Sequence, residues 1–141
     1  MVMLEANLDD MTGETLGYVM TRLLDAGAFD VFFTPIQMKK NRPASKLSVL
    51  VAPADREKIT ALILAETSTL GVRYQNWHRT IMKRTFEEVE TPYGAVHLKI
   101  ATYGKTKKVT PEYADCAQLA QKCHIPLTTV YQAALQARKH Q

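Results

Sequence analysis

The chain has 141 residues, of which 46% are hydrophobic and 23% charged, and its formal net charge is +4 at pH 7. This length is enough for one domain with a small appendage, and no apolar run is long enough to span a membrane. Because we also see no signal peptide, we expect a cytoplasmic protein. The first 36 residues carry six acidic side chains and one basic one, so the rest of the chain holds a surplus of nine positive charges. This asymmetry indicates an anionic ligand on the basic side.

The first third of the chain predicts a strand, a helix and a second strand. Residues 2–8 form a short apolar run, and apolar side chains at helical spacing over 16–24 predict a helix that Gly27 ends. Apolar residues then alternate with others over 29–34, which predicts a strand. Pro35 cannot donate to a neighbouring strand, so this strand is expected at a sheet edge.

The next stretch repeats the same order of elements. The nearly continuous apolar run at 47–51 predicts a central strand, residues 55–66 predict a helix, and a fourth strand is expected from Val72. The simplest compact arrangement of βαββαβ is a ferredoxin-like sheet with both helices on one face. We therefore predict an α+β protein whose residues 1–77 form a ferredoxin-like domain.

The pattern changes after residue 77. Residues 78–141 are predicted to form a β-hairpin followed by two C-terminal helices, packed as a small second subdomain. The expected elements are a hairpin of 80–90 and 96–100 with a turn at 91–94, a basic connector at 105–108, and helices at 112–123 and 127–138. The cysteines, Cys116 and Cys123, match no zinc spacing, and the four histidines are scattered.

The most charged feature of the chain is the segment 37–43. It places Lys39, Lys40 and Arg42 between two apolar runs, and Pro43 prevents a helix there. The planar guanidinium of Arg42 can bind two phosphate oxygens, while the two lysines act as point charges. The alternative is a solvated hairpin tip. The sequence thus indicates a cationic loop suited to phosphates.

Two polar clusters could assist such a loop. Asp9 and Asp10 follow the first strand, where their hard oxygens could orient hydrated magnesium or manganese; alternatively, one of them only caps the next helix. Thr67, Ser68 and Thr69 gather three hydroxyls near Arg73, although ordinary capping at a helix end is the alternative for this group.

Five segments in order resemble the C-terminal half of the LarC nickel-insertion proteins, and the resemblance covers nearly the whole chain. Ser68 and Ala114 depart from the family pattern, in which Thr and an acid are usual. The five segments are Asn7–Met11, Gln37–Pro43, Glu66–Arg73, Glu90–Gly94 and Pro111–Cys116.

The resemblance implies a nickel chelatase of the lyase class. Such an enzyme inserts nickel into pyridinium-3,5-bisthiocarboxylic acid mononucleotide, which yields the nickel-pincer cofactor of lactate racemase. It implies CTP, bound with magnesium or manganese and cleaved to CMP and pyrophosphate, as the driver. Asp9 and Asp10 would then hold the metal. The nucleotide would meet Lys39, Lys40, Arg42, Thr67, Thr69, Arg73 and Lys99.

The resemblance also implies partners. The family's N-terminal half precedes the Asn7 segment, so we expect this chain to be a separated gene product or a piece of a longer protein, incomplete without that half. It further implies a trimer-based homo-oligomer and no membrane or nucleic-acid partner. The competing hypothesis is a DNA-binding regulator, in which a ferredoxin-like sensor precedes a helix-turn-helix made by the last two helices.

Overall fold

The computed structural model describes residues 1–139, and the chain divides into two compact units, Met1–Arg79 and the part from Thr80 onward. Of the four histidines, His140 lies outside the described residues. No helix formed by residues 1–139 is long and apolar enough to cross a membrane.

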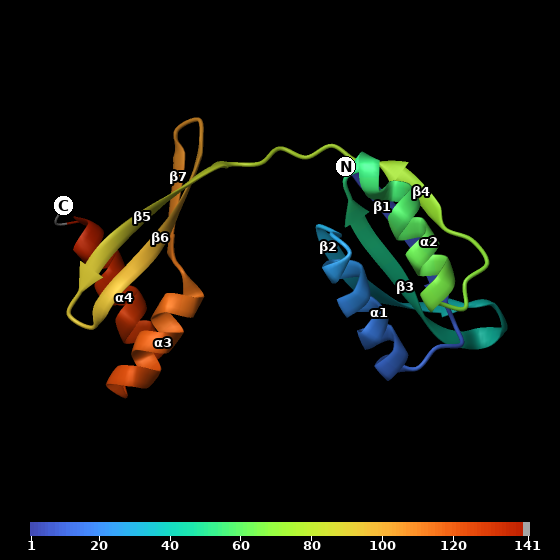
Figure 1. Ribbon diagram of the computed structural model, residues 1–141, viewed down its shortest axis with the longest axis horizontal. Helices are drawn as coiled ribbons and strands as arrows, with labels where there is room; N and C mark the ends of the chain where they lie inside the picture. The colour runs from blue at the N-terminus through green and yellow to red at the C-terminus, as the bar shows by residue number, and fades with distance from the viewer. Residues whose placement is uncertain (140–141) are drawn as a thin grey trace. The chain divides into compact units, whose positions relative to one another are not determined.

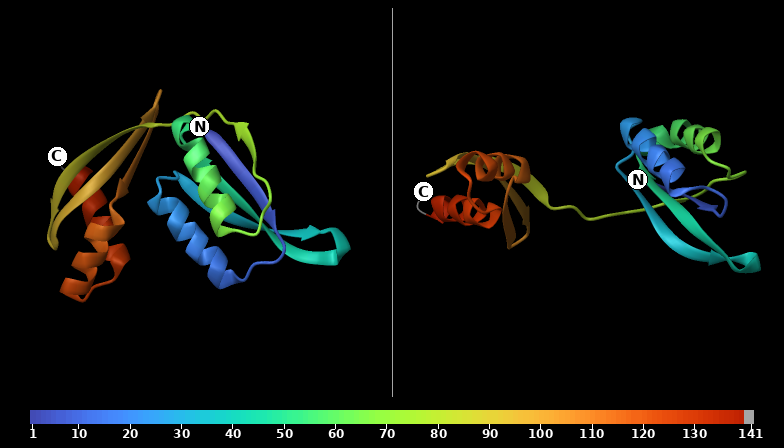
Figure 2. Two further views of the ribbon diagram at one scale, coloured as in Figure 1. Left: turned by 45° about the vertical axis from the view of Figure 1, so that its right-hand side comes forward. Right: turned by 90° about the horizontal axis from the view of Figure 1, so that it is seen from below.

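The first unit is the predicted ferredoxin-like fold. Its strands form one antiparallel sheet in the order β2-β3-β1-β4, and both helices lie against the same face of that sheet (Figure 1; Figure 2). The edge position of β2 and the central position of β3 are confirmed. The elements are β1 (Val2–Leu8), α1 (Gly13–Asp25), β2 (Asp30–Met38), β3 (Arg42–Val51), α2 (Arg56–Glu66) and β4 (Arg73–Asn76).

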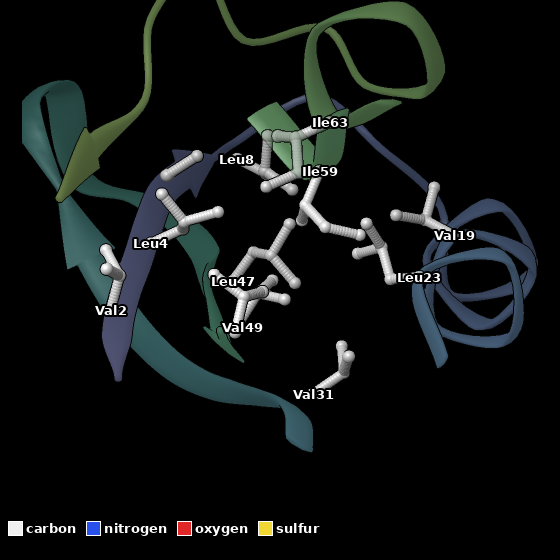
Figure 3. Packing of buried hydrophobic residues seen from close by; sticks show 12 residues of the cluster. Val2, Leu4, Leu8, Val19, Leu23, Val31, Leu47, Val49, Ile59 and Ile63 are labelled. Carbon is white, nitrogen blue, oxygen red and sulfur yellow. The ribbon is translucent and has the colours of Figure 1, made fainter. Parts of the chain in front are cut away.

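Alternation along β1 decides which side chains enter the core. Its even-numbered residues, from Val2 to Leu8, are buried toward the helices. They meet Val19 and Leu23 of α1 and Ile59 and Ile63 of α2, as Figure 3 shows. Full burial of a large aliphatic side chain stabilises a fold by roughly 1.5–3 kcal/mol. This core therefore holds both helices on one face and leaves the odd-numbered residues of β1 on the other.

The turn between β2 and β3 is tighter than predicted. We expected a charged loop over 37–43, but β2 continues to Met38 and β3 begins at Arg42, so that only the 3-10 turn Lys39–Asn41 joins them. The strands extend because each residue of the predicted loop's flanks finds a cross-strand partner, as in the pair Met38 and Arg42. The cations consequently stand on a rigid hairpin.

The second unit has one strand more than predicted. Its antiparallel sheet has the order β5-β6-β7, and the expected connector 105–108 was wrong because β7 begins at Thr106 and pairs with β6. Lysines are tolerated there because β7 is an edge strand, where exposed charge discourages aggregation. The elements are β5 (Lys83–Thr91), β6 (Gly94–Tyr103), β7 (Thr106–Pro111), α3 (Tyr113–Cys123) and α4 (Leu127–Lys139).

A separate core holds this unit together. Val96 and Leu98 of β6 pack with Cys116 of α3 and with Val130 and Ala134 of α4, all of them buried. Burial raises the pKa of the Cys116 thiol. Cys116 is therefore a buried thiol of the core.

An ion cluster centred on His97 fastens the start of α3 to the sheet. Asp115 Oδ2 accepts hydrogen bonds from the His97 backbone N–H and lies 2.8 Å from His97 Nδ1, while His97 Nε2 lies 3.1 Å from Glu88 Oε2. The hydrogen bond to Asp115, with the charges of Asp115, Glu88 and Glu112, raises the pKa of His97 above its ordinary value. The protonated ring is thus favoured in the folded state.

This cluster predicts a pH-dependent stability of the second unit. Because the folded-state pKa of His97 is raised, its contribution is complete below the ordinary histidine pKa of about 6.5 and is lost as the pH rises through the higher folded-state pKa. Thermal unfolding followed at several pH values should show the melting temperature falling over this range. His97→Gln should remove that fall, whereas His78→Gln, at an exposed position outside every element, should retain it. An unchanged pH dependence in His97→Gln would contradict the assignment.

Candidate functional site

The face of the first sheet opposite the helices, here called the open face, carries polar side chains in ordered rows. The strand register places Glu5 of β1 between Ser48 of β3 and Arg73 of β4. In the next row, Asn7 lies beside Lys46. Within the described part of this unit no helix covers these side chains, so they are available to a ligand.

Glu5 is the centre of a charged network on the open face. Lys46 Nζ lies 3.1 Å from Glu5 Oε1, and Arg73 Nε donates to Glu5 Oε2 at 3.1 Å. Arg73 Nη2 also donates to Asn7 Oδ1 at 2.8 Å. Burial by itself would raise the pKa of Glu5, but the hydrogen bonds and charges of Lys46 and Arg73 outweigh it and lower that pKa. One carboxylate thus holds two cations in place and leaves the network with a net positive charge.

A groove on the open face is lined both by residues of this network and by Lys39 of the 3-10 turn Lys39–Asn41, here called the basic turn. Its volume is about 590 Å³, which falls within the usual range for small-molecule sites. The cations that line it are Lys39 from the turn, Lys46 and Arg73, with Asn7 and Thr34 as neutral polar groups. Three cations that converge on one groove suit an anionic ligand. We call it the open-face groove.

The basic turn has an unusual backbone. Lys40 and Asn41 have φ angles of 60° and 56°, in the left-handed region. Asn tolerates this conformation, but for Lys it costs roughly 1–2 kcal/mol relative to an ordinary backbone. Lys40 is exposed and is absent from the lining of the open-face groove, so its side chain stands beside the site rather than in it. Strain of this kind is typical of functional positions.

Arg42 already has an anionic partner. Its Nη1 donates to Asp9 Oδ2 at 3.2 Å, a single contact rather than the two-pronged grip that its guanidinium could give a phosphate. The side chain of Arg42 is 53% exposed and that of Asp9 is 23% exposed. Arg42, which is predicted to bind phosphate, and Asp9, which is predicted to bind the metal, are therefore paired with each other in this structure.

Asp10 is hydrogen-bonded to the loop that carries Thr67, Ser68 and Thr69. Ser68 Oγ donates a short hydrogen bond to Asp10 Oδ1, whereas Thr67 and Thr69 bond to main-chain oxygens, of Ile63 at 2.7 Å and of Gly71 at 2.9 Å. Thr67 therefore caps the end of α2, and Thr69 shapes the loop that follows it. Ser68, the residue that departs from the family pattern, is the one that links this loop to a carboxylate.

Within residues 1–139, no group of three or more His, Cys, Asp or Glu side chains is arranged so that it could hold a metal ion. Magnesium does not require one, since it is commonly bound by one or two carboxylates, water and the phosphates of a nucleotide. Asp9 and Asp10 can supply such carboxylates, and Asp9 would have to exchange Arg42 for the ion.

Some of the predicted site residues meet and others do not. Lys39 and Arg73 share the open-face groove, but Lys99 lies in the second unit, where its Nζ is 3.1 Å from Glu112 Oε1. Sequence reasoning missed Glu5 and Lys46. Glu5 could have been found, because it occupies an odd position in the apolar run of β1, on the face that the core does not use.

Comparison with known families supports one assignment. The family model described as "Nickel insertion protein" matches residues 1–131. The pyridinium-3,5-bisthiocarboxylic acid mononucleotide nickel insertion proteins of Lactiplantibacillus plantarum and Acetivibrio thermocellus are 67% and 47% identical over 136 and 135 residues. In both cases 96% of this chain is matched, against 32% and 33% of the relatives. The chain thus spans about a third of the length of these curated relatives.

Two solved structures are similar over nearly the whole chain. One is described as "LarC2, the C-terminal domain of a cyclometallase involved in the synthesis of the NPN cofactor of lactate racemase"; it has a TM-score of 0.92 and 66% identity, and the match covers 98% of this chain and 96% of the other. A protein from Methanopyrus kandleri has a TM-score of 0.76 and 29% identity, with coverages of 97% and 85%. The fold is therefore shared with a domain of a metal-inserting enzyme.

The basic turn permits a test of its backbone strain. Lys40→Gly should raise the free energy of unfolding by about 1 kcal/mol, because glycine adopts a φ of 60° without steric conflict. Lys39→Gly is the matched control: it removes the same charge from a position without positive φ and should lower stability. Urea unfolding of both variants measures the difference. Equal effects of the two substitutions would show that the turn stores no strain.

Proposed function

Because this chain belongs to the nickel insertion protein family, we propose that it forms the nucleotide-binding part of a nickel-inserting enzyme. In this proposal the enzyme is a chelatase of the lyase class that inserts nickel into pyridinium-3,5-bisthiocarboxylic acid mononucleotide. The product would be the nickel-pincer cofactor of lactate racemase, and cleavage of CTP to CMP and pyrophosphate would drive the insertion. The similarity to a cyclometallase domain supports the reaction class.

The convergence of Lys39, Lys46 and Arg73 on the open-face groove is the observation that carries the nucleotide assignment. A triphosphate is a compact polyanion. Charge-assisted hydrogen bonds from lysine and arginine to its oxygens are shorter and stronger than hydrogen bonds between neutral groups. Glu5 holds Lys46 and Arg73 at 3.1 Å each, so these cations are ordered before the ligand arrives. Preordered side chains reduce the entropy that binding would otherwise lose.

The metal would lie at the end of the groove near the loop that follows β1. We propose that Asp9 and Asp10 hold magnesium or manganese, or its bound waters, while the phosphates complete the coordination. Arg42 would separate from Asp9 when the ion binds, and its guanidinium could then form a bidentate contact with the phosphates. Lys40, Thr67 and Thr69 remain proposed secondary contributors to nucleotide binding, whereas Lys99 belongs to the second unit and is not assigned to this groove.

The chain's partners also remain proposals. We propose that the N-terminal part of the family's longer proteins contributes to holding the nickel or the thiocarboxylate, and that the chain works in the cytoplasm without a nucleic-acid partner. We propose a trimer-based homo-oligomer, for which the edge strand β2 offers unpaired backbone groups. Against the helix-turn-helix alternative, α4 packs on β5 and β7 instead of standing free as a recognition helix.

CTP binding tests the nucleotide assignment. Isothermal calorimetry with CTP and magnesium or manganese should show saturable binding to the 141-residue chain. Arg73→Gln should weaken it roughly tenfold to a hundredfold, because a hydrogen bond to a charged group is lost inside the groove.

Arg56→Gln is the matched control for this measurement. Arg56 belongs to α2, where it contacts Glu57 at 2.6 Å and lies over the ring of Tyr74 on the helix-covered side of the sheet. Its loss should leave CTP affinity unchanged. Equal losses in both variants would refute the groove as the binding site, and a wild-type chain that binds no CTP with either metal would refute the nucleotide assignment.

Incubation of precursor, nickel, CTP and magnesium with the chain tests the proposed division of labour. Mass spectrometry should detect no metallated nucleotide when the chain acts alone, because soft ligands suited to nickel are scarce in it. Addition of the family's N-terminal part should restore insertion. Efficient turnover by this chain alone would contradict the division of labour and show that the nickel site lies within these 141 residues.

A further inference from the structure

The second unit contains a groove that the proposed function has not used. It lies between β7, the start of α3 and α4, and has a volume of about 490 Å³. We call it the β7 groove; its walls include Val109, Tyr113, Tyr131 and Leu135, with Lys99 and Glu112 at the rim. The side chain of Tyr113 is 65% exposed and that of Leu135 is 37% exposed. Its size and mostly apolar walls are typical of small-molecule sites.

Aromatic surface distinguishes this groove from the open-face groove. Two tyrosines contribute to the β7 groove, whereas no aromatic side chain lines the open-face groove. Tyr131 also packs against the core of the unit, so its position is fixed by packing. A fixed aromatic wall and an exposed tyrosine at the opening provide faces on which a flat ring can stack.

The rim of the β7 groove carries both signs of charge. Lys99 Nζ lies 3.1 Å from Glu112 Oε1, and the two side chains are 38% and 35% exposed. Lys108 does not line the groove; it is paired with Ala101 in the strand register, two residues along β6 from Lys99 and on the same face of the sheet. Lys108 has no ion-pair partner closer than 4.0 Å within residues 1–139. A ligand that is both cationic and anionic can therefore find a partner for each charge.

We propose that the β7 groove binds a mononucleotide whose base is a pyridinium ring bearing acidic substituents. The positive ring would stack on Tyr113 and Tyr131, because a cation is attracted to an aromatic face, and it would lie beside the Glu112 carboxylate. The acidic substituents and the phosphate would meet Lys99 and Lys108. The identification of this ligand with the enzyme's substrate rests on the proposed function, but the site itself is independent of the open-face groove.

The surroundings of the groove limit the length of an anionic ligand. Beyond Lys99 on the same side of β6 comes His97, flanked by Glu88 and Asp115, and Glu112 lies at the rim itself. A nucleic-acid strand that followed β6 would bring its phosphates against these carboxylates, which repel them. A single nucleotide ends before that point, so the charges favour a mononucleotide over a polymer.

Nicotinic acid mononucleotide is a suitable probe, because it combines a pyridinium ring, a carboxylate and a phosphate. Calorimetry with the full chain should show saturable binding, and Tyr113→Ala should weaken it roughly fivefold to thirtyfold. Tyr103→Ala is the matched control, since Tyr103 is 60% exposed in the same unit but does not line the groove. Both tyrosines are exposed, so neither substitution should unfold the chain.

A second comparison isolates the role of the rim carboxylate. Glu112→Gln should weaken the binding of nicotinic acid mononucleotide but should not weaken that of uridine monophosphate, whose ring is neutral. Equal weakening of both probes would overturn the pairing of Glu112 with the ring charge. Lys99→Gln should weaken both probes, because both carry a phosphate.

The outcomes separate this proposal from the previous one. The β7 groove is refuted if the chain binds CTP but not nicotinic acid mononucleotide, or if Tyr113→Ala binds the probe as tightly as wild type. If the wild-type chain binds the probe, Tyr113→Ala weakens that binding and CTP does not bind, the β7 groove is supported and the proposed function is not. Tighter binding of single-stranded oligonucleotides than of the mononucleotide, lost in Tyr113→Ala, would overturn the ligand class in favour of a nucleic acid.

Discussion

The alternation of side chains along β1 is the constraint on which the first unit depends. Because successive residues of a strand point to opposite faces, burial of Leu4 beneath the helices compels Glu5 to lie on the open face. A register shift of one residue would bury Glu5 and expose the aliphatic side chains. The same hydrophobic burial that stabilises this unit therefore also places the carboxylate that orders Lys46 and Arg73.

The charged side chains beside the two grooves lie mostly in ion pairs of opposite sign. Glu5 holds two cations, Asp9 holds Arg42, and Lys99 meets Glu112. These pairs are partly exposed, so each contributes little to folding stability, typically about 0–1 kcal/mol. Their consequence is geometric: side chains that would otherwise sample many rotamers are oriented toward grooves. The surplus of positive charge that remains suits the anionic ligands proposed for both units.

The family assignment and the geometry address different questions. The similarity to nickel insertion proteins identifies the family and the fold, but it extends over only about a third of the length of the curated relatives. The arrangement of Lys39, Lys46 and Arg73 supports an anionic ligand whatever the rest of those proteins does. The two grooves belong to two units with separate cores.

The sequence by itself determined the order of the elements in the first unit, the edge position of β2 and the central position of β3, because hydrophobic periodicity and the position of Pro35 are local properties. It also predicted Lys39 and Arg73 as nucleotide-binding residues, and the structure places both on the open-face groove. Only the tertiary structure showed that Arg42 pairs with Asp9, that Glu5 joins Lys46 to Arg73, and that the lysines near 107 lie on a strand. Each of these depends on strand pairing between residues far apart in the chain, and an edge strand rich in lysine lacks the apolar pattern by which strands are recognised.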